Sequence, residues 1–193
     1  MLSSCPTEST HPLFSASSRQ ALRDTTHQKL GYSPSDIVLL LIGNDWRNKG
    51  LPVLLEAMSF LPHHPLHLCV VGSDNPAGFS PQVQALHLSD RVKFFGESSQ
   101  MLSFYAPADI CAAPSLEDSF NLPGLEAMAC GLPVVVSRQA GINEYIAGAV
   151  DGILLQELQD PRALAGFFSL LLQQPDLRRS LGENADRKVS QFS

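Results

Sequence analysis

Two acidic side chains lie on either side of a predicted helix start in the segment from 114 to 144. Asp118 lies in the loop before the helix, and Glu126 lies inside its first turns. Asn121 is a suitable N-cap, and Gly131 suits the residue just after the helix. Backbone N–H groups at a helix start carry partial positive charge and favour phosphate or another anion. The segment therefore indicates a site for an anionic ligand.

Glu126 is nearly alone as a polar group between Leu122 and Val136. A carboxylate in apolar surroundings needs a hydrogen-bond partner, and a pair of sugar hydroxyls would suit it. Acids in the first turn of a helix also complement the helix dipole or face water. Each acid taken alone, Glu117 included, is explained by that structural role, so only their combination points to a ligand.

Two cations, Arg47 and Lys49, follow a predicted strand in the stretch GNDWRNKGL at 43–51. A single exposed lysine is ordinary on a protein surface, so Lys49 alone is equally explained as part of a solvated basic loop. Its place between the carboxyl end of a strand and the start of a helix favours a binding role.

The elements that must position these residues alternate between apolar strands and helices. The predicted strands are continuous apolar runs at 37–42, 66–71, 92–95, 109–113, 133–136 and 153–155. The predicted helices lie at 51–61, 101–106, 123–130, 142–147 and, as two helices, within 160–190. Strands that are apolar on both sides and separated by helices indicate a parallel sheet covered on both faces. The chain is thus expected to be a single α/β domain with a doubly wound, Rossmann-like parallel sheet.

Small, flexible or polar residues end nearly every predicted strand. They are Gly43-Asn44, Gly72-Ser73-Asp74, Gly96-Glu97, Pro114-Ser115 and the run from Ser137 to Gly141. In open parallel sheets, ligands bind outside the carboxyl ends of the strands. Ordinary turns use the same residues, so this pattern alone is compatible with either explanation.

Length and composition limit the function classes. The chain has 193 residues with a net charge of -6, which suits one domain and argues against a protein that wraps nucleic acid. No apolar run approaches the roughly 20 residues of a membrane span, and no secretory signal is visible. The four cysteines lack C-x-x-C spacing, so buried thiols in a reducing cytoplasm are expected. Residues 1–18 are rich in Ser, Thr and Pro, which predicts a loose arm before a domain at 19–193.

The segment from 114 to 144 resembles the donor-binding segment of retaining glycosyltransferases of the group 1 type (glycosyltransferase family 4), which have the GT-B fold. Their pattern is a proline-serine pair, two acids separated by seven residues, an alanine-rich helix, glycine and proline. Asp118 and Glu126 have that separation, and Asp118 stands where the family usually has Glu. The family often has glycine where this chain has Ser119 and Asn121.

The resemblance implies roles for these residues. Glu126 would hold the ribose hydroxyls of a nucleotide sugar, and Asp118 would approach the hexose. Backbone amides near the sugar and phosphate would come from Ser119, Phe120, Asn121 and Leu122. The stretch at 43–51 resembles the family's phosphate-binding loop, with Gly43 and Lys49 matching and Asn44 replacing the usual arginine. Arg47 is then the candidate for the second cation, since fixed cations stabilise the charge of a departing diphosphate.

Three weaker matches extend the resemblance over roughly residues 20 to 190. Gly141 and Glu144 match a loop that approaches the donor, Gly96 lies in the loop beside the nucleotide base, and Gly72 fits the loop after the second strand. No metal or other cofactor is expected, because the family needs none for its leaving group. The histidines His63, His64 and His67 lie at the opposite edge of the sheet and are expected in a surface turn.

The resemblance implies the C-terminal half of a GT-B enzyme that transfers a sugar from a UDP- or GDP-linked donor. The N-terminal acceptor domain and the final crossover helix would lie outside this chain, which alone would be weakly active or inactive. One alternative is a non-catalytic nucleotide-sugar-binding subunit of a split glycosyltransferase, with a partner chain supplying the acceptor domain. A second is a fragment of a GT-B epimerase acting on a nucleotide sugar.

Overall fold

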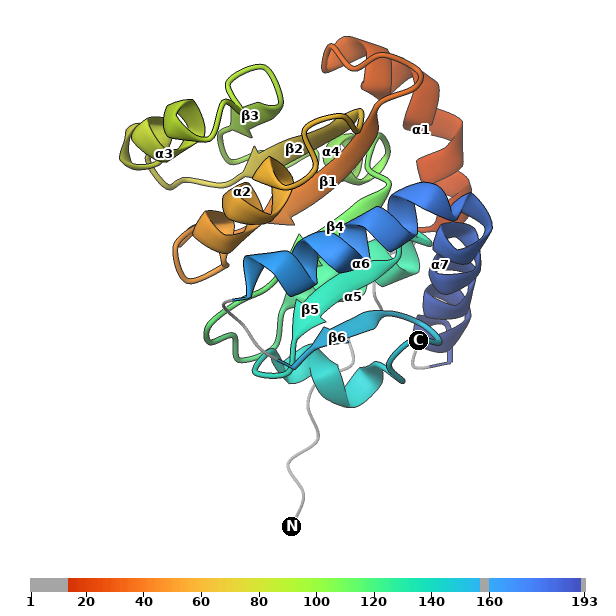
Figure 1. The fold of residues 1–193 in the computed structure, drawn as a ribbon. Helices are drawn as coiled ribbons and strands as arrows, with labels where there is room; N and C mark the ends of the chain where they lie inside the picture. The colour runs from red at the N-terminus through yellow and green to blue at the C-terminus, as the bar shows by residue number, and fades with distance from the viewer. Residues whose placement is uncertain (1–13, 157–159, 192–193) are drawn as a thin grey trace.

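A six-stranded parallel sheet forms the centre of the molecule in the computed structural model, which describes residues 14–156 and 160–191 (Figure 1). The strands are β1 (Ile37–Ile42), β2 (Leu66–Val71), β3 (Val92–Phe95), β4 (Ile110–Ala113), β5 (Val134–Ser137) and β6 (Ile153–Leu155). Their order is β3-β2-β1-β4-β5-β6, and all neighbouring pairs are parallel. This is the order of doubly wound sheets, so the predicted fold class is confirmed.

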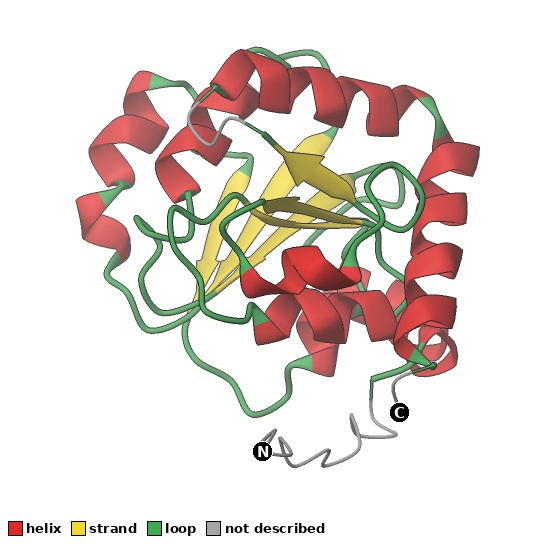
Figure 2. Ribbon diagram, turned by 90° about the horizontal axis from the view of Figure 1, so that it is seen from below, coloured by secondary structure: helices red, strands yellow, loops and turns green. Residues whose placement is uncertain are grey.

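Helices cover both faces of the sheet, as Figure 2 shows. They are α1 (Ala16–Lys29), α2 (Leu51–Ser59), α3 (Ser80–Ala85), α4 (Leu102–Tyr105), α5 (Leu122–Ala129), α6 (Pro161–Gln173) and α7 (Pro175–Val189), with short 3-10 turns η1 (Pro76–Gly78) and η2 (Gly141–Tyr145). Successive residues of a strand point to opposite faces. Leu39 and Leu41 of β1 therefore pack in one core with α2 and α6, while Val38 and Leu40 pack in the other with α4 and α5.

The sequence did not predict α1 or α3. Helix α1 is polar, and only Thr26 and His27 are buried along it, so it lacks the apolar spacing that identifies a helix. Helix α3 is six residues long with only Val83 buried. The predicted arm at 1–18 also ends earlier than expected, because Ser15 caps α1 and the helix begins at Ala16. The rest of that arm, residues 1–13, lies outside the described residues.

The cysteines within the described residues are buried and free, as expected: Cys69, Cys111 and Cys130. Cys5 lies outside that part of the chain. Across 14–156 and 160–191, no helix is both long and apolar enough to cross a membrane.

The reversal of strand order places two distant loops together. β1 pairs with β2 on one side and with β4 on the other, with Leu39 beside Ile110. The connections that follow β1 and β4 therefore lead in opposite directions along the sheet, while the loops that begin them lie next to each other. Such a switch point is where open α/β sheets bind ligands. The loop after β1 carries the predicted cations, and the loop after β4 carries the predicted acids.

Candidate functional site

The lysine loop, residues 43–50, folds so that the stem of Lys49 lies across Gly43. A Cβ atom at Gly43 would lie 2.9 Å from both Cγ and Cε of Lys49. Gly43 also has φ +154°, a conformation that favours glycine. Glycine at this position therefore provides the space in which the lysine stem runs toward the loop after β4.

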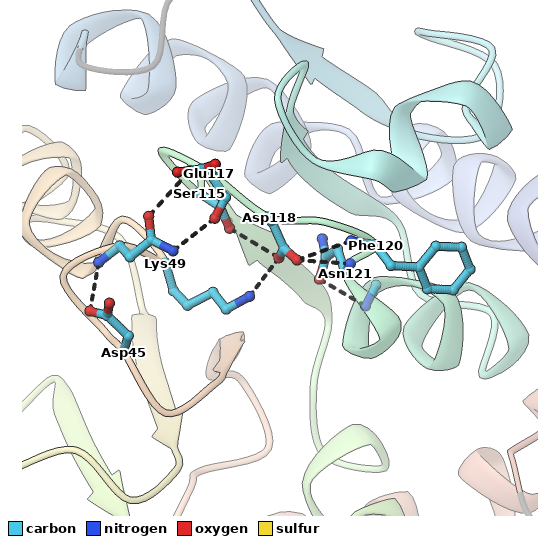
Figure 3. A network of polar contacts seen from close by, with 9 residues as sticks. Asp45, Lys49, Ser115, Glu117, Asp118, Phe120 and Asn121 are labelled. Carbon is cyan, nitrogen blue, oxygen red and sulfur yellow. Dashed lines mark hydrogen bonds and ion pairs between the residues drawn. The ribbon is translucent and has the colours of Figure 1, made fainter.

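The acid loop, residues 114–121, receives the end of that lysine (Figure 3). Lys49 Nζ donates to Asp118 Oδ2 at 2.6 Å, and both side chains are largely buried. The other oxygen, Oδ1, accepts the backbone N–H of Asn121 at 2.9 Å. Longer contacts of 3.4 Å reach Asp118 from Ser115 Oγ and Phe120 N. The structure thus brings two predicted site residues into direct contact, and protein groups engage both carboxylate oxygens.

Asn121 begins helix α5 in a left-handed conformation, with φ +57° and ψ +58°. Its side-chain oxygen accepts the N–H of Gly124 at 3.3 Å, so the predicted N-cap is confirmed. Glycine adopts the left-handed conformation readily, and asparagine is one of the few other residues that does so. Asn121 can therefore follow the same backbone path as the glycine that is common at this position in the family that the sequence resembles.

Replacing Asn121 by alanine is expected to lower the free energy of unfolding by about 1–3 kcal/mol. The alanine variant loses the cap, which contributes about 1 kcal/mol. It is also destabilised because alanine adopts the left-handed conformation less readily than asparagine. Asn121→Gly is the matched control, because it loses the cap and keeps the conformation, at a cost of a few tenths of a kcal/mol. Urea unfolding of the two variants measures the difference, and equal losses would contradict this account.

Glu126 lies on α5 and is half-buried, with a protein partner that the sequence did not indicate. Tyr105 at the end of α4 donates its hydroxyl to Glu126 Oε2 at 2.6 Å. Burial raises the pKa of Glu126, and the hydrogen bond from Tyr105 opposes that shift. The expectation that this carboxylate needs a partner holds, but the partner within the chain is a tyrosine. A ligand hydroxyl would have to share or replace that bond.

Arg47 is not brought to Lys49 or Asp118. It is exposed, and its guanidinium lies 5.8 Å from the centre of the Phe79 ring. It also lines a cavity of about 330 Å³ beside the start of α2. The side chains of Arg47 and Lys49 extend from the loop toward different partners, Phe79 and Asp118. The spacing of the two residues in the sequence could not predict this difference.

The loops after β1, β2 and β3 are joined by Asn44. Its side-chain oxygen accepts the N–H of Ser73 at 3.1 Å, and its side-chain nitrogen donates to Glu97 at 3.0 Å. Gly72, which follows β2, lies against the lysine loop, where a Cβ atom would be 1.9 Å from the carbonyl oxygen of Gly43. Gly96 after β3 faces open space. Among the described residues, no neighbouring atom is close enough to require glycine at this position.

The segment after β5 pairs with the acid loop. The N–H of Gly141 donates to the carbonyl oxygen of Asp118 at 3.0 Å, and a Cβ atom at Gly141 would lie 2.1 Å from Ser119 O. Phe120 and Leu122 are exposed on the same loop and helix start. Glu144 lies in η2, and its side chain is outside the described part of the structure. The structure therefore groups Gly141 with the acid loop.

Sequence reasoning missed two residues that hold the site: Asn48, which contacts the acid loop, and Tyr105, which contacts Glu126. Both contacts join residues far apart in the chain, so no local spacing could reveal them. A different hollow of about 470 Å³ lies at the opposite edge of the sheet. It lies away from the carboxyl ends of the strands, where open parallel sheets bind ligands, so it is not the candidate site. Its four arginines donate to carbonyl or carboxylate oxygens; they are Arg19, Arg23, Arg178 and Arg179.

Comparison with known proteins shows which family the chain resembles over most of its length. The family profile described as "Glycosyl transferases group 1" matches residues 23–188. The lipopolysaccharide glucosyltransferase WaaG of Escherichia coli K12 is 31% identical over 166 residues, which are 84% of this chain and 44% of WaaG. The crystal structure of WaaG superposes with a TM-score of 0.86 at 28% identity, over 93% of this chain and 50% of that one.

Two further structures are similar. Anabaena HepE in complex with UDP-glucose has a TM-score of 0.81 at 25% identity, over 87% of this chain and 47% of that one. The C-terminal domain of LpcC, a group 1 glycosyl transferase from Francisella tularensis, shares the fold, with a TM-score of 0.79 at 22% identity over 93% of this chain and 94% of that domain. The chain spans about half the length of WaaG and HepE.

Proposed function

The chain belongs to the group 1 glycosyl transferases, and on that premise we propose that it is the donor-binding, C-terminal half of a retaining enzyme. The enzyme would transfer a sugar from a nucleoside diphosphate to an acceptor. The acceptor would be held by an N-terminal domain, as the two-domain GT-B architecture requires. The buried free thiols suit a reducing cytoplasm.

One observation carries the proposal: Lys49 Nζ lies 2.6 Å from Asp118 beside the N-terminal end of α5, at the switch point of the sheet. A nucleoside diphosphate gains negative charge when its bond to the sugar breaks. An ammonium group and the N-terminal amides of a helix are fixed positive groups that stabilise such charge. The chemistry needs no metal ion in this proposal, because these groups supply the positive charge.

The remaining roles follow from position. Glu126, on the same helix, would bind the ribose hydroxyls, with Tyr105 holding the carboxylate in place. Asp118 would orient the hexose while its contact with Lys49 fixes the lysine. Lys49 is the principal cation, since Arg47 faces Phe79.

UDP-linked sugars are the first candidates for the donor. HepE, which has the same fold, is known in complex with UDP-glucose, and WaaG is a glucosyltransferase. GDP-linked sugars are the second candidates. A non-catalytic binding subunit with a separate acceptor chain would bind the same ligands, and co-purification with such a partner would favour it.

Calorimetric titration of the chain with UDP and with GDP tests the proposal. Binding of at least one is expected, and no binding of either would refute the proposed function. Replacing Glu126 by glutamine is then expected to lower the affinity for that nucleotide about tenfold. A neutral amide makes weaker hydrogen bonds to ribose hydroxyls than a carboxylate does.

Glu126→Gln is also expected to stabilise the protein at neutral pH. Burial raises the folded-state pKa of Glu126, so its contribution to stability is fully present below the unfolded-state pKa of about 4.3 and is lost as pH rises through the folded value. Glutamine stays neutral and avoids that loss. The stability gain measured in urea should vanish at pH 4, whereas a gain equal at pH 4 and pH 7 would contradict this assignment. Glu183→Gln, on the exposed face of α7, is the control.

A further inference from the structure

Asn48 joins the lysine loop to the acid loop. The sequence alone indicates no role for this residue. Its side-chain nitrogen donates to the carbonyl oxygen of Glu117 at 2.7 Å, and its side-chain oxygen accepts the N–H of Glu117 at 3.2 Å. Its own carbonyl oxygen accepts the N–H of Leu116 at 2.8 Å. Three hydrogen bonds therefore connect this residue to two consecutive residues of the acid loop.

Asn48 is itself held in place. Its N–H donates to Asp45 Oδ1 at 3.0 Å, which closes a turn inside the lysine loop. On the other side of Lys49, Gly50 lies against Pro114, where a Cβ atom would be 2.4 Å from the proline carbonyl oxygen. The residues on both sides of Lys49 thus touch the acid loop, so the direction in which Lys49 leaves the backbone is fixed relative to Asp118.

We propose that Asn48 is a positioning residue that holds the two loops in one register, so that Lys49 Nζ reaches the diphosphate of the donor. This inference rests on the proposed function, in which Lys49 binds phosphate. Asn48 itself need not touch the ligand. Its effect passes through the backbone of Glu117 to Asp118, and from Asp118 to the ammonium group of Lys49.

The chemistry of the side chain explains why asparagine suits this place. The peptide of Glu117 presents an N–H and a carbonyl to the same side chain, so its partner must accept and donate at once. A carboxamide does both, whereas an ionised carboxylate accepts only and an ammonium group donates only. Asparagine also reaches the loop with fewer rotatable bonds than glutamine, so less side-chain entropy is lost.

The test compares a ligand that has phosphates with one that lacks them. UDP and uridine are titrated into the unmodified chain and into Asn48→Ala, with GDP and guanosine as the second pair. We expect Asn48→Ala to weaken UDP binding about tenfold and uridine binding less than twofold, because only the phosphates depend on Lys49. Asn184→Ala is the matched control: it removes an amide link from α7 to the carbonyl of Val150, which lies on a different part of the fold.

A double-mutant cycle with Lys49→Met separates positioning from general structural support. If Asn48 acts through Lys49, its replacement should have no further effect on UDP affinity once Lys49 is methionine. Equal losses for UDP and uridine, unchanged UDP affinity, or a full effect of Asn48→Ala in the Lys49→Met background would each overturn the inference. If Asn48→Ala lacks a cooperative unfolding transition, Asn48→Asp replaces it in the cycle, because an ionised carboxylate loses the donor to the carbonyl oxygen of Glu117. Failure of the unmodified chain to bind any of the nucleotides would instead refute the proposed function.

Discussion

Replacing Lys49 by methionine is expected to weaken UDP binding about 10- to 100-fold and to leave uridine binding nearly unchanged. Methionine keeps much of the aliphatic stem that lies across Gly43 and removes the ammonium group. A hydrogen bond to a charged group contributes about 1.5–3 kcal/mol, which corresponds to the stated change in affinity. Isothermal titration calorimetry at low ionic strength measures both ligands.

The controls for Lys49→Met address charge and stability. Lys29→Met removes one positive charge at the end of α1, far from the carboxyl ends of the strands, and should leave UDP affinity unchanged. Lys49→Met should also lower the free energy of unfolding by about 1–3 kcal/mol, because the largely buried carboxylate of Asp118 loses its cation. A tenfold or greater loss for uridine as well as UDP would show that the site had collapsed and would contradict a phosphate-specific role.

Replacing Gly72 by alanine is expected to cost more than about 3 kcal/mol of folding stability. The new Cβ atom would lie 1.9 Å from the carbonyl oxygen of Gly43 and 2.7 Å from its carbonyl carbon, so two backbones would have to separate. Gly72 also has φ +149°, which side chains rarely adopt. The ends of β1 and β2 would spread apart, and the start of the lysine loop would move with them.

Gly96→Ala provides the control for Gly72→Ala, because each glycine directly follows its strand. Gly96 faces open space, so its replacement should change the free energy of unfolding by less than about 0.5 kcal/mol. Urea unfolding of the two variants measures the difference. Similar stabilities for both would mean that the loops after β1 and β2 do not approach each other as closely as described.

The strands and their ends could be predicted from the sequence because burial on both faces leaves a plain signal. The run at 37–42 is apolar throughout, and the interior of β1 is buried accordingly. Helix α5 was predicted from its Asn121 cap and from Gly131, which has φ +67°. Helix α1 could not be predicted because it has no apolar face with helical spacing. It contacts the rest of the protein through polar side chains such as Arg23, which pairs with Asp109.

The site was predicted in outline but not in its contacts. Asp118 and Lys49 could be named from their loops, since the carboxyl ends of parallel strands share one edge of the sheet. Their pairing, however, joins residues 69 positions apart, and the bond from Tyr105 to Glu126 spans 21. The side to which Arg47 turns depends on the aromatic ring of Phe79, which belongs to another loop. Such contacts are set by tertiary structure and leave no periodic trace in the chain.

The position of the site between β1 and β4 also concerns how the domain folds. Strands β1 to β3 and strands β4 to β6 form two halves of the sheet that meet only along the β1–β4 seam. Lys49 belongs to the first half, and Asp118 belongs to the second. A ligand held by both loops binds only after the seam has closed, and it then stabilises the closed form by mass action. The β1–β4 seam is thus both the junction between the two halves of the sheet and the place where a ligand held by the two loops would link them.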